Sequence, residues 1–269
     1  MIDRGTGPAV VKIPGVQGRW EWMEPAVDAL ADHCRVITGS LTDDRDSVGS
    51  IDPTSGFESY VEWVDTLLDR AGLTEAVVCG VSYGGLVALH HAAVRPQRVK
   101  ALILVSTPAP TWTPNCRVHW YLRAPRLLSP LFPLSSPFRL YPELMASFPD
   151  FLERSAFALR HLYRVTRYPF TPTRMAHRVR LLSGVDFTAD CRRVKAPTLV
   201  ITGDPGLDRV VPVESTREYI DTITGAVHKQ LHGTGHIGLI TSPDRFREAV
   251  GTFIATHHGY GATLERVSA

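Results

Sequence analysis

The residues that could do chemistry begin with a serine among glycines, in the run Gly80-Val81-Ser82-Tyr83-Gly84-Gly85. This run follows a short apolar segment, Ala76–Cys79, that is typical of a buried strand, and it precedes an apolar helical stretch. A serine on such a sharp strand-to-helix turn takes strained backbone angles, and the small residues around it let strand and helix pass closely. Its hydroxyl is then presented at the carboxyl end of the strand, beside helix amides that stabilise negative charge. The pattern predicts a serine nucleophile, and a glycine-rich turn with an incidental serine is the alternative.

In this context the motif resembles the nucleophile turn of the α/β-hydrolase family, and the resemblance covers nearly the whole chain. The family places an acid and then a histidine downstream of the serine. After a predicted strand at Thr198–Thr202, the loop at 203–212 resembles the family's Gly-x-x-Asp-x-x-Val-Pro loop with two extra residues before the acid. That register implies Asp208 as the acid. Asp204 is the competing choice, and either carboxylate could instead bond its own backbone in a turn.

The catalytic base implied by the resemblance is His236. It stands in His232-Gly233-Thr234-Gly235-His236, after a predicted strand at Ala226–Leu231, where Gly235-His236 matches the loop that carries the family's base. His232 and His228 fit better as residues at a strand end or on the surface. A serine hydroxyl needs a base to become a good nucleophile, so His236 would take the proton of Ser82 while Asp208 holds the imidazole in the right tautomer.

The family also aims two backbone amides at the oxygen that becomes negative, one from the residue after the nucleophile and one from the loop after an early strand. The resemblance assigns this oxyanion hole to Tyr83 and Val16. The early loop departs from the family, because Pro14 precedes Gly15 where relatives commonly have histidine before glycine. Gly15 still permits the bend that the loop needs.

The elements that must position these groups alternate along the chain. Six aliphatic runs predict strands, at Ala9–Ile13, Arg35–Thr38, Ala76–Cys79, Val99–Val105, Thr198–Thr202 and Ala226–Leu231. Helical patterns lie between them, at Trp22–His33, Phe57–Ala71, Tyr83–Val94 and Pro243–His257. Most of the strands are apolar on both faces, as parallel strands covered by helices on both sides are. We therefore expect an α/β fold with a doubly wound, mostly parallel sheet of about six strands.

The family's core usually begins with an antiparallel hairpin, and we expect that hairpin to be absent because only eight residues precede Ala9. Its loss would leave the first parallel strands near a sheet edge. An exposed edge favours pairing with another chain, so a homodimer is a hypothesis.

The alternation stops between Pro108 and Asp190, which predicts a helical cap over residues 108–190 inserted into a core of residues 1–107 and 191–269. The insertion holds eleven Arg, no Lys and five acids, a net charge of +6, so the rest of the chain carries −4. It also contains 13 of the 23 aromatic residues. In the family such a cap lies over the nucleophile and shapes the pocket.

Aromatic side chains offer large rigid surfaces, which favours a small acyl substrate with an apolar or aromatic part. The arginines would grip an anionic group on that substrate, unless they coat the solvent face of short helices. The candidate pocket residues are Trp20, Trp22, Trp112, Trp120 and Tyr121. Trp20 and Trp22 could equally pack at a helix start against the sheet.

Composition and charge exclude several classes of partner. The net charge of +2 gives no reason to expect nucleic acid. The four cysteines lie far apart with no zinc-ligand spacing, which favours a reducing compartment, and no motif indicates a metal, a nucleotide or a flavin cofactor. The N-terminus lacks a signal-type stretch and no apolar run is long enough to span a bilayer, so we expect a cytoplasmic protein without a membrane partner.

The leading hypothesis is a serine hydrolase that cleaves a carboxylic ester or a related acyl bond through an acyl-enzyme. The same three residues could cleave a carbon–carbon bond in a diketo acid, which a cap arginine in the pocket would favour, or pass the acyl group to an acceptor other than water. Because fold does not determine function, a ligand-binding receptor on this scaffold is the alternative from another class.

Overall fold

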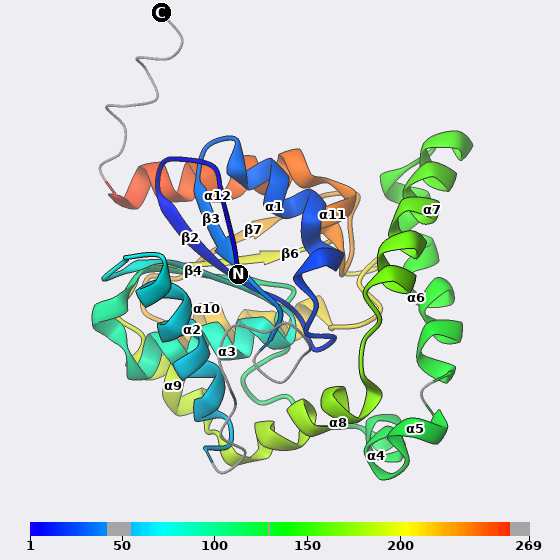
Figure 1. Ribbon diagram of the computed structural model, residues 1–269, viewed down its shortest axis with the longest axis horizontal. Coiled ribbons are helices and arrows are strands. Elements are labelled where there is room, and N and C mark those ends of the chain that lie inside the picture. The colour runs from blue at the N-terminus through cyan, green and yellow to red at the C-terminus, as the bar shows by residue number, and fades with distance from the viewer. Residues whose placement is uncertain (42–54, 129, 259–269) are drawn as a thin grey trace, which may run out of the picture.

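The computed structural model describes residues 1–41, 55–128 and 130–258, which contain a seven-stranded sheet in the order β1-β3-β2-β4-β5-β6-β7 (Figure 1). The strands are β1 (Ile2–Arg4), β2 (Ala9–Ile13), β3 (Arg35–Thr38), β4 (Ala76–Val81), β5 (Val99–Val105), β6 (Thr198–Thr202) and β7 (Val227–Gln230). All neighbours pair in parallel except β1 and β3. The predicted α/β class with a mostly parallel, doubly wound sheet is confirmed.

Strand β1 corrects the expected number of strands, about six, because it adds an antiparallel strand before β2. It pairs antiparallel with β3, with Ile2 opposite Thr38 and Arg4 opposite Val36. Asp3 holds it in place, because its two carboxylate oxygens accept hydrogen bonds from Arg35 Nε and Nη2 at 3.0 and 2.7 Å. The outer edge of β3 is therefore covered, and the three-residue strand β1 forms this edge of the sheet.

The two faces of the sheet each bury alternate residues of the strands. Val10, Val36 and Val77 pack on one face against α1 (Glu24–Ala31), α11 (Gly238–Thr241) and α12 (Pro243–His258). Val11, Ile37 and Val78 pack on the other face against α2 (Glu58–Arg70), α3 (Tyr83–Val94), α9 (Phe187–Arg193) and α10 (Arg217–Thr222). Burial on both faces is the reason that apolar residues occupy consecutive positions of these strands rather than every second one.

Between β5 and β6 the chain forms a run of helices. They are α4 (Cys116–Arg123), α5 (Pro125–Leu128), α6 (Leu131–Ser147), α7 (Phe151–Arg167), α8 (Pro172–Leu181) and the core helix α9. In Figure 1, α6 and α7 lie along one edge of the molecule, away from the sheet, and α4 and α5 lie beneath them. Helix α9 instead packs on α3, so the boundary expected at residue 190 falls inside a helix that belongs to the core layer.

No helix among the described residues combines the length and the apolar character needed to cross a bilayer.

Candidate active site

The predicted nucleophile stands on a strained turn between β4 and α3. Ser82 has φ 52° and ψ −121°, a left-handed backbone conformation that costs energy for any residue other than glycine. The flanking glycines make the turn possible, because a Cβ on Gly80 would lie 2.6 Å from the Cα of Gly85 and a Cβ on Gly84 would lie 2.6 Å from the carbonyl oxygen of Ile13. The turn thus holds the Ser82 side chain at the carboxyl end of β4.

The predicted acid and base meet at the carboxyl ends of β6 and β7. Asp208 Oδ2 lies 3.2 Å from His236 Nδ1, and the Asp208 side chain is almost completely buried. The other oxygen, Oδ1, accepts the backbone N–H groups of Val210 and Val211 at 2.9 and 2.8 Å. These two bonds fix the carboxylate, so Oδ2 can hold only one orientation toward the imidazole.

The competing acid, Asp204, has a different set of partners. Its oxygens accept the backbone N–H of Gly233 at 2.7 Å and Gln230 Nε2 at 2.7 Å, and Oδ1 lies 3.3 Å from His232 Nδ1. Asp204 therefore ties the loop after β6 to the loop after β7. Of the two carboxylates, only Asp208 contacts His236.

Burial and nearby charge shift the pKa values of Asp208 and His236 in opposite directions. Burial disfavours the imidazolium, but the Asp208 charge, its hydrogen bond and the charge of Glu143 outweigh burial and raise the pKa of His236. Burial also disfavours the Asp208 carboxylate, yet the charge and hydrogen bond of His236, together with the two backbone N–H donors, lower the pKa of Asp208. The pair therefore favours an ionised acid beside a histidine that readily takes up a proton.

A second buried carboxylate, Glu143 on α6, lies on the other side of the histidine loop. It is completely buried, Oε2 accepts the backbone N–H of Ile237 at 3.1 Å, and Oε1 lies 3.3 Å from the Thr241 hydroxyl. Burial raises the pKa of Glu143 more than the backbone hydrogen bonds of Gly235 and Ile237 and the charge of His236 lower it. Glu143 links the inserted helices directly to the loop that carries His236.

The loop after β2, which holds the predicted oxyanion residue Val16, runs beside the serine. A Cβ on Gly15 would lie 3.7 Å from Ser82 Cβ, and Gly18 N–H closes the turn on the Gly15 carbonyl at 2.8 Å. The Val16 carbonyl accepts a hydrogen bond from Nη1 of Arg178, a fully buried arginine on α8, at 2.7 Å. The other predicted residue, Tyr83, is the first residue of α3 and is buried.

The three predicted catalytic residues follow β4, β6 and β7, so all stand at the same edge of the sheet. Within the described part of the chain, no hydrogen bond joins the Ser82 hydroxyl to His236. Catalytic hydrogen bonds are often long in a protein without substrate and tighten only when the substrate binds.

The five aromatic residues predicted to line a pocket lie in different surroundings. Trp20 is half-buried beneath Arg4, and Trp22 Nε1 donates to the Tyr168 carbonyl at 2.9 Å while its ring contacts His161 and Phe170 edge-on. Trp112 is half-buried, and Trp120 is 63% exposed. Tyr121 is half-buried, and its buried hydroxyl has no hydrogen-bond partner among the residues that the structure describes.

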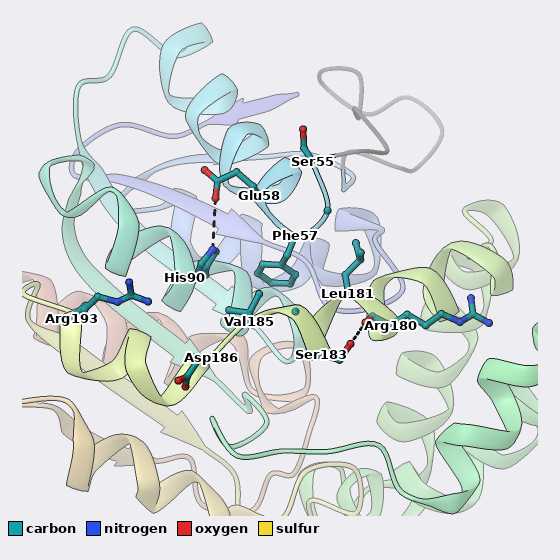
Figure 2. A pocket seen from close by; sticks show the side chains of 12 residues that line it. Ser55, Phe57, Glu58, His90, Arg180, Leu181, Ser183, Val185, Asp186 and Arg193 are labelled. Carbon is teal, nitrogen blue, oxygen red and sulfur yellow. Dashed lines mark hydrogen bonds and ion pairs between the residues drawn. The ribbon is translucent and has the colours of Figure 1, made fainter.

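A cavity of about 600 Å³ lies between the start of α2, His90 on α3 and the stretch from α8 to α9 (Figure 2). Phe57 and Val185 lie near its centre, with Arg180 and Arg193 at opposite ends. His90 Nδ1 lies 2.8 Å from Asp190 Oδ2. None of the predicted catalytic, oxyanion or pocket residues lines this cavity.

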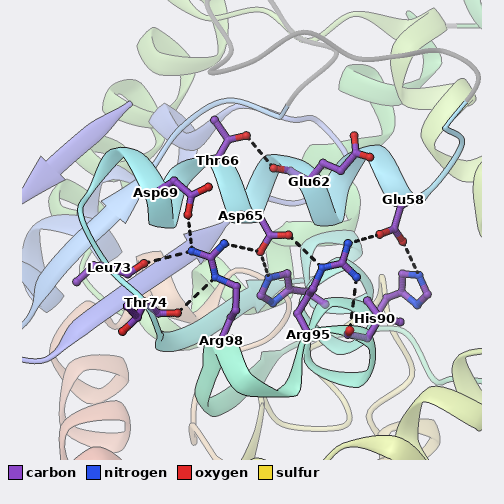
Figure 3. A network of polar contacts seen from close by, with 12 residues as sticks. Glu58, Glu62, Asp65, Thr66, Asp69, Leu73, Thr74, His90, Arg95 and Arg98 are labelled. Carbon is purple, nitrogen blue, oxygen red and sulfur yellow. Dashed lines mark hydrogen bonds and ion pairs between the residues drawn. The ribbon is translucent and has the colours of Figure 1, made fainter.

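A polar network anchors the far end of α3, the helix that begins at the serine (Figure 3). Asp65 on α2 lies between Arg95 and Arg98, with both ion pairs at 3.2 Å, and it also contacts His91 at 3.2 Å. Arg95 reaches Glu58 at 2.7 Å. These contacts hold the direction of α3 and therefore the orientation of the turn at its start.

Neither a metal site nor a disulfide contributes to this arrangement in the residues that the structure covers. No three His, Cys, Asp or Glu side chains there gather closely enough to hold a metal ion. All four cysteines are free, with Cys116 exposed and the other three buried.

Fold and site together define the class. Residues 10–249 match the model of the alpha/beta hydrolase family, and the chain belongs to that family as an alpha/beta hydrolase enzyme. It is 26% identical over 258 residues to the protein named "Putative carbamate hydrolase RutD" of Stutzerimonas stutzeri (strain A1501), covering 94% of this chain and 93% of that protein.

Two solved structures have the same fold with a TM-score of 0.75 and 23% identity. One is a hydrolase from Pseudomonas aeruginosa PA01, with 94% of this chain and 92% of that chain covered. The other is the enol-lactonase from Burkholderia xenovorans LB400, with 94% and 95% covered.

Sequence reasoning missed two residues that contact the loops of the site, Glu143 and Arg178. Both come from the insertion, whose composition had suggested a source of substrate contacts. Glu143 carried a usable signal, because it is a single acid inside the otherwise uncharged stretch Leu140–Phe148. Arg178 is one of eleven arginines in the insertion, and nothing in the sequence distinguishes it from the exposed ones.

Proposed function

We propose that the protein is a serine hydrolase that cleaves a carboxylic ester, or a related acyl compound, through an acyl-enzyme. Ser82 Oγ attacks the carbonyl carbon while His236 takes the hydroxyl proton, with Asp208 orienting the imidazole and stabilising its cation. The bond between the acyl carbon and the leaving oxygen breaks, and His236 returns the proton to the departing alcohol. Water then attacks the acyl-enzyme by the same route, releasing the acid and restoring Ser82.

The observation that carries this proposal is the strained backbone of Ser82 at the edge of the sheet where the buried Asp208–His236 pair also stands. Strain at a nonglycine residue costs stability and is retained mainly where function needs it. The N–H groups of Tyr83 and Val16 would receive the negative oxygen of the tetrahedral intermediate. The close approach of Gly15 to the Ser82 side chain supports this role for the loop after β2.

The insertion at 108–190 would serve as the cap of this site. Its contacts with the loops beside Ser82 and His236, through Arg178 and Glu143, support that role. We propose that the acyl substrate is small, with an apolar or aromatic part that the half-buried Trp22, Trp112 and Tyr121 would contact. Trp120 is too exposed to contribute to an enclosed pocket.

A carbamate is the second candidate substrate class, because several relatives that match 71–94% of the chain are named "Putative carbamate hydrolase RutD". A carbamate carbonyl would be attacked by the same groups in the same order. The products separate the two classes, since a carbamate releases an amine or ammonia together with carbon dioxide.

The test measures hydrolysis of p-nitrophenyl acetate, p-nitrophenyl butyrate and a carbamate by the wild type and by Ser82→Ala. Loss of the nucleophile is expected to lower turnover by about 10⁴-fold or more on every substrate that is cleaved. Equal rates for the two proteins would refute the hydrolase proposal. Binding of an acyl compound without turnover by the wild type would favour the receptor alternative.

A further inference from the structure

Helix α6 carries a row of large apolar side chains on the side that faces solvent. Leu131, Leu134, Phe138, Tyr141 and Met145 follow one another at spacings of three and four, which places them on one face of a helix. All five are exposed, with Phe138 at 78% and Leu134 at 65%. We call these five residues the α6 strip.

The opposite face of α6 contacts the protein through polar residues among others. Glu143 is completely buried, and the Ser147 hydroxyl donates to the Gly233 carbonyl at 2.9 Å. Each stands two residues after a member of the α6 strip, which is about 200° around a helix. A surface helix normally buries its large apolar side chains and exposes its charged ones, whereas α6 exposes the five residues of the α6 strip and buries Glu143.

Helix α7 adds a second apolar face. Leu152, Leu159, Leu162 and Tyr163, here called the α7 strip, are all more than half exposed. The helix contacts the core through other residues, since the ring of His161 contacts Trp22 and Arg164 pairs with Glu24 at 3.0 Å.

The exposed apolar surface is concentrated in one region of the chain. Of the 15 large hydrophobic residues that are exposed in the described residues, 12 lie between Trp120 and Tyr163. Helices α6 and α7 also lie at one edge of the molecule (Figure 1). A soluble protein rarely exposes such a concentration unless it contacts something there.

The positive charge around these helices favours an anionic partner. The insertion carries eleven arginines against five acids. In the described part of the chain, Arg160 contacts only the Ala156 carbonyl and Arg123 lies over the Trp120 ring at 5.9 Å, so neither pairs with a carboxylate. A second copy of the chain would bring like charge against like charge, whereas an anionic surface would neutralise it.

We propose that the α6 and α7 strips, with the arginines around them, form a docking surface for a bilayer interface that contains anionic phospholipids. Helices that lie in the plane of such an interface bury Leu, Phe and Trp at the acyl boundary and keep Arg at the headgroups. The sequence expectation of no membrane partner rested on the lack of a spanning segment, and this mode of binding needs none. The docking surface is independent of the proposed hydrolase activity.

The test is cosedimentation of the full chain with vesicles of phosphatidylcholine alone or of phosphatidylcholine mixed with phosphatidylglycerol, at low and at high salt. We expect binding to the mixed vesicles at low salt, at least tenfold weaker binding to the neutral vesicles, and loss of binding at high salt. No binding to the mixed vesicles, or equal binding to both kinds, would overturn the proposal.

Two matched pairs of variants locate the surface. Arg160→Glu changes the charge by two, and each charge near an anionic surface changes the affinity about fivefold, so this variant is expected to weaken vesicle binding about 30-fold. Arg70→Glu, the same change at the exposed end of α2, is expected to leave binding intact. Phe138→Ser is expected to weaken binding at least tenfold, whereas Val227→Ser on the exposed β7 leaves it intact. Equal effects within either pair would refute the location.

Light scattering in solution tests whether a second copy of the chain, rather than a lipid surface, covers the α6 and α7 strips. A monomer is expected for the wild type and for Phe138→Ser, and their thermal melts should coincide because the Phe138 side chain contacts mainly solvent. A dimer that Phe138→Ser dissociates would show that the face joins two copies of the chain and would overturn the lipid proposal.

Discussion

Replacing Asp208 by asparagine separates the chemical role of this carboxylate from its structural role. Oδ1 accepts the N–H groups of Val210 and Val211, and only Oδ2 faces His236. In Asp208→Asn the amide oxygen can keep both backbone bonds, which places the NH₂ group opposite the imidazole. A donor there requires Nδ1 to accept, so the proton moves to Nε2 and the histidine can no longer take the proton of Ser82.

The change of histidine tautomer in Asp208→Asn sets the expected loss of kcat. An equivalent change in a serine protease triad lowers kcat by about 10⁴-fold, which corresponds to about 5.5 kcal/mol in the activation free energy. Folding should change little in Asp208→Asn, because both backbone donors keep an acceptor. Asp208→Ala leaves the buried N–H of Val211 unpaired, at about 1–3 kcal/mol, and also removes the acceptor of the more exposed Val210 N–H, so it should lower Tm by several degrees as well.

The assay is p-nitrophenyl ester hydrolysis with thermal unfolding measured on the same samples, and Asp204→Asn is the control. Asp204 contacts Gly233, Gln230 and His232 but not His236, so its variant should lose less than about tenfold in kcat. Retention of a tenth or more of the wild-type kcat by a folded Asp208→Asn would refute this reasoning. A loss in Asp204→Asn as large as that in Asp208→Asn would refute it equally.

Three further measurements test other parts of the structure. His236 acts as a base only when neutral, so its raised pKa should place the acid limb of the kcat/KM profile at a pH above the ordinary histidine pKa. Glu143→Gln removes a negative charge that favours the imidazolium, so this variant should move the acid limb to lower pH. Gly84→Ala should lower the free energy of unfolding by about 1–3 kcal/mol in a urea titration, because the new Cβ meets the Pro14 carbonyl, and an unchanged midpoint would contradict the tight packing of the turn. Ellman's reagent should react with one thiol of the native protein, the exposed Cys116, and with four after denaturation; rapid reaction of a second native thiol would contradict the burial of the others.

The sequence predicted the elements whose signal is strong and local. Strands β2, β4 and β5 are apolar on both faces, and that pattern identified them as parallel and covered. Strand β1 was missed because three residues are too few to show a pattern, and its place depends on the contact between Asp3 and Arg35, which are 32 residues apart.

In the candidate site, too, the sequence predicted the residues with a local signal and missed those that only tertiary contacts place there. Ser82 could be identified because its motif and its two flanking elements are contiguous in the chain. The choice between Asp204 and Asp208 needed the register of a known family, since both carboxylates lie in one loop and only tertiary contacts separate them. Glu143 reaches His236 from 93 positions away, by way of a helix whose orientation no local pattern specifies.

The two faces of α6 connect events on opposite sides of one helix. Its outer face carries the α6 strip, and its inner face holds the histidine loop through Glu143 and Ser147. A ligand that displaces the helix from outside therefore changes the free energy of the loop inside, and thermodynamic linkage makes the effect reciprocal. A reversible ligand at Ser82 that shifts the histidine loop would alter the protein's affinity for its outer ligand by the same factor by which the outer ligand alters affinity at the serine.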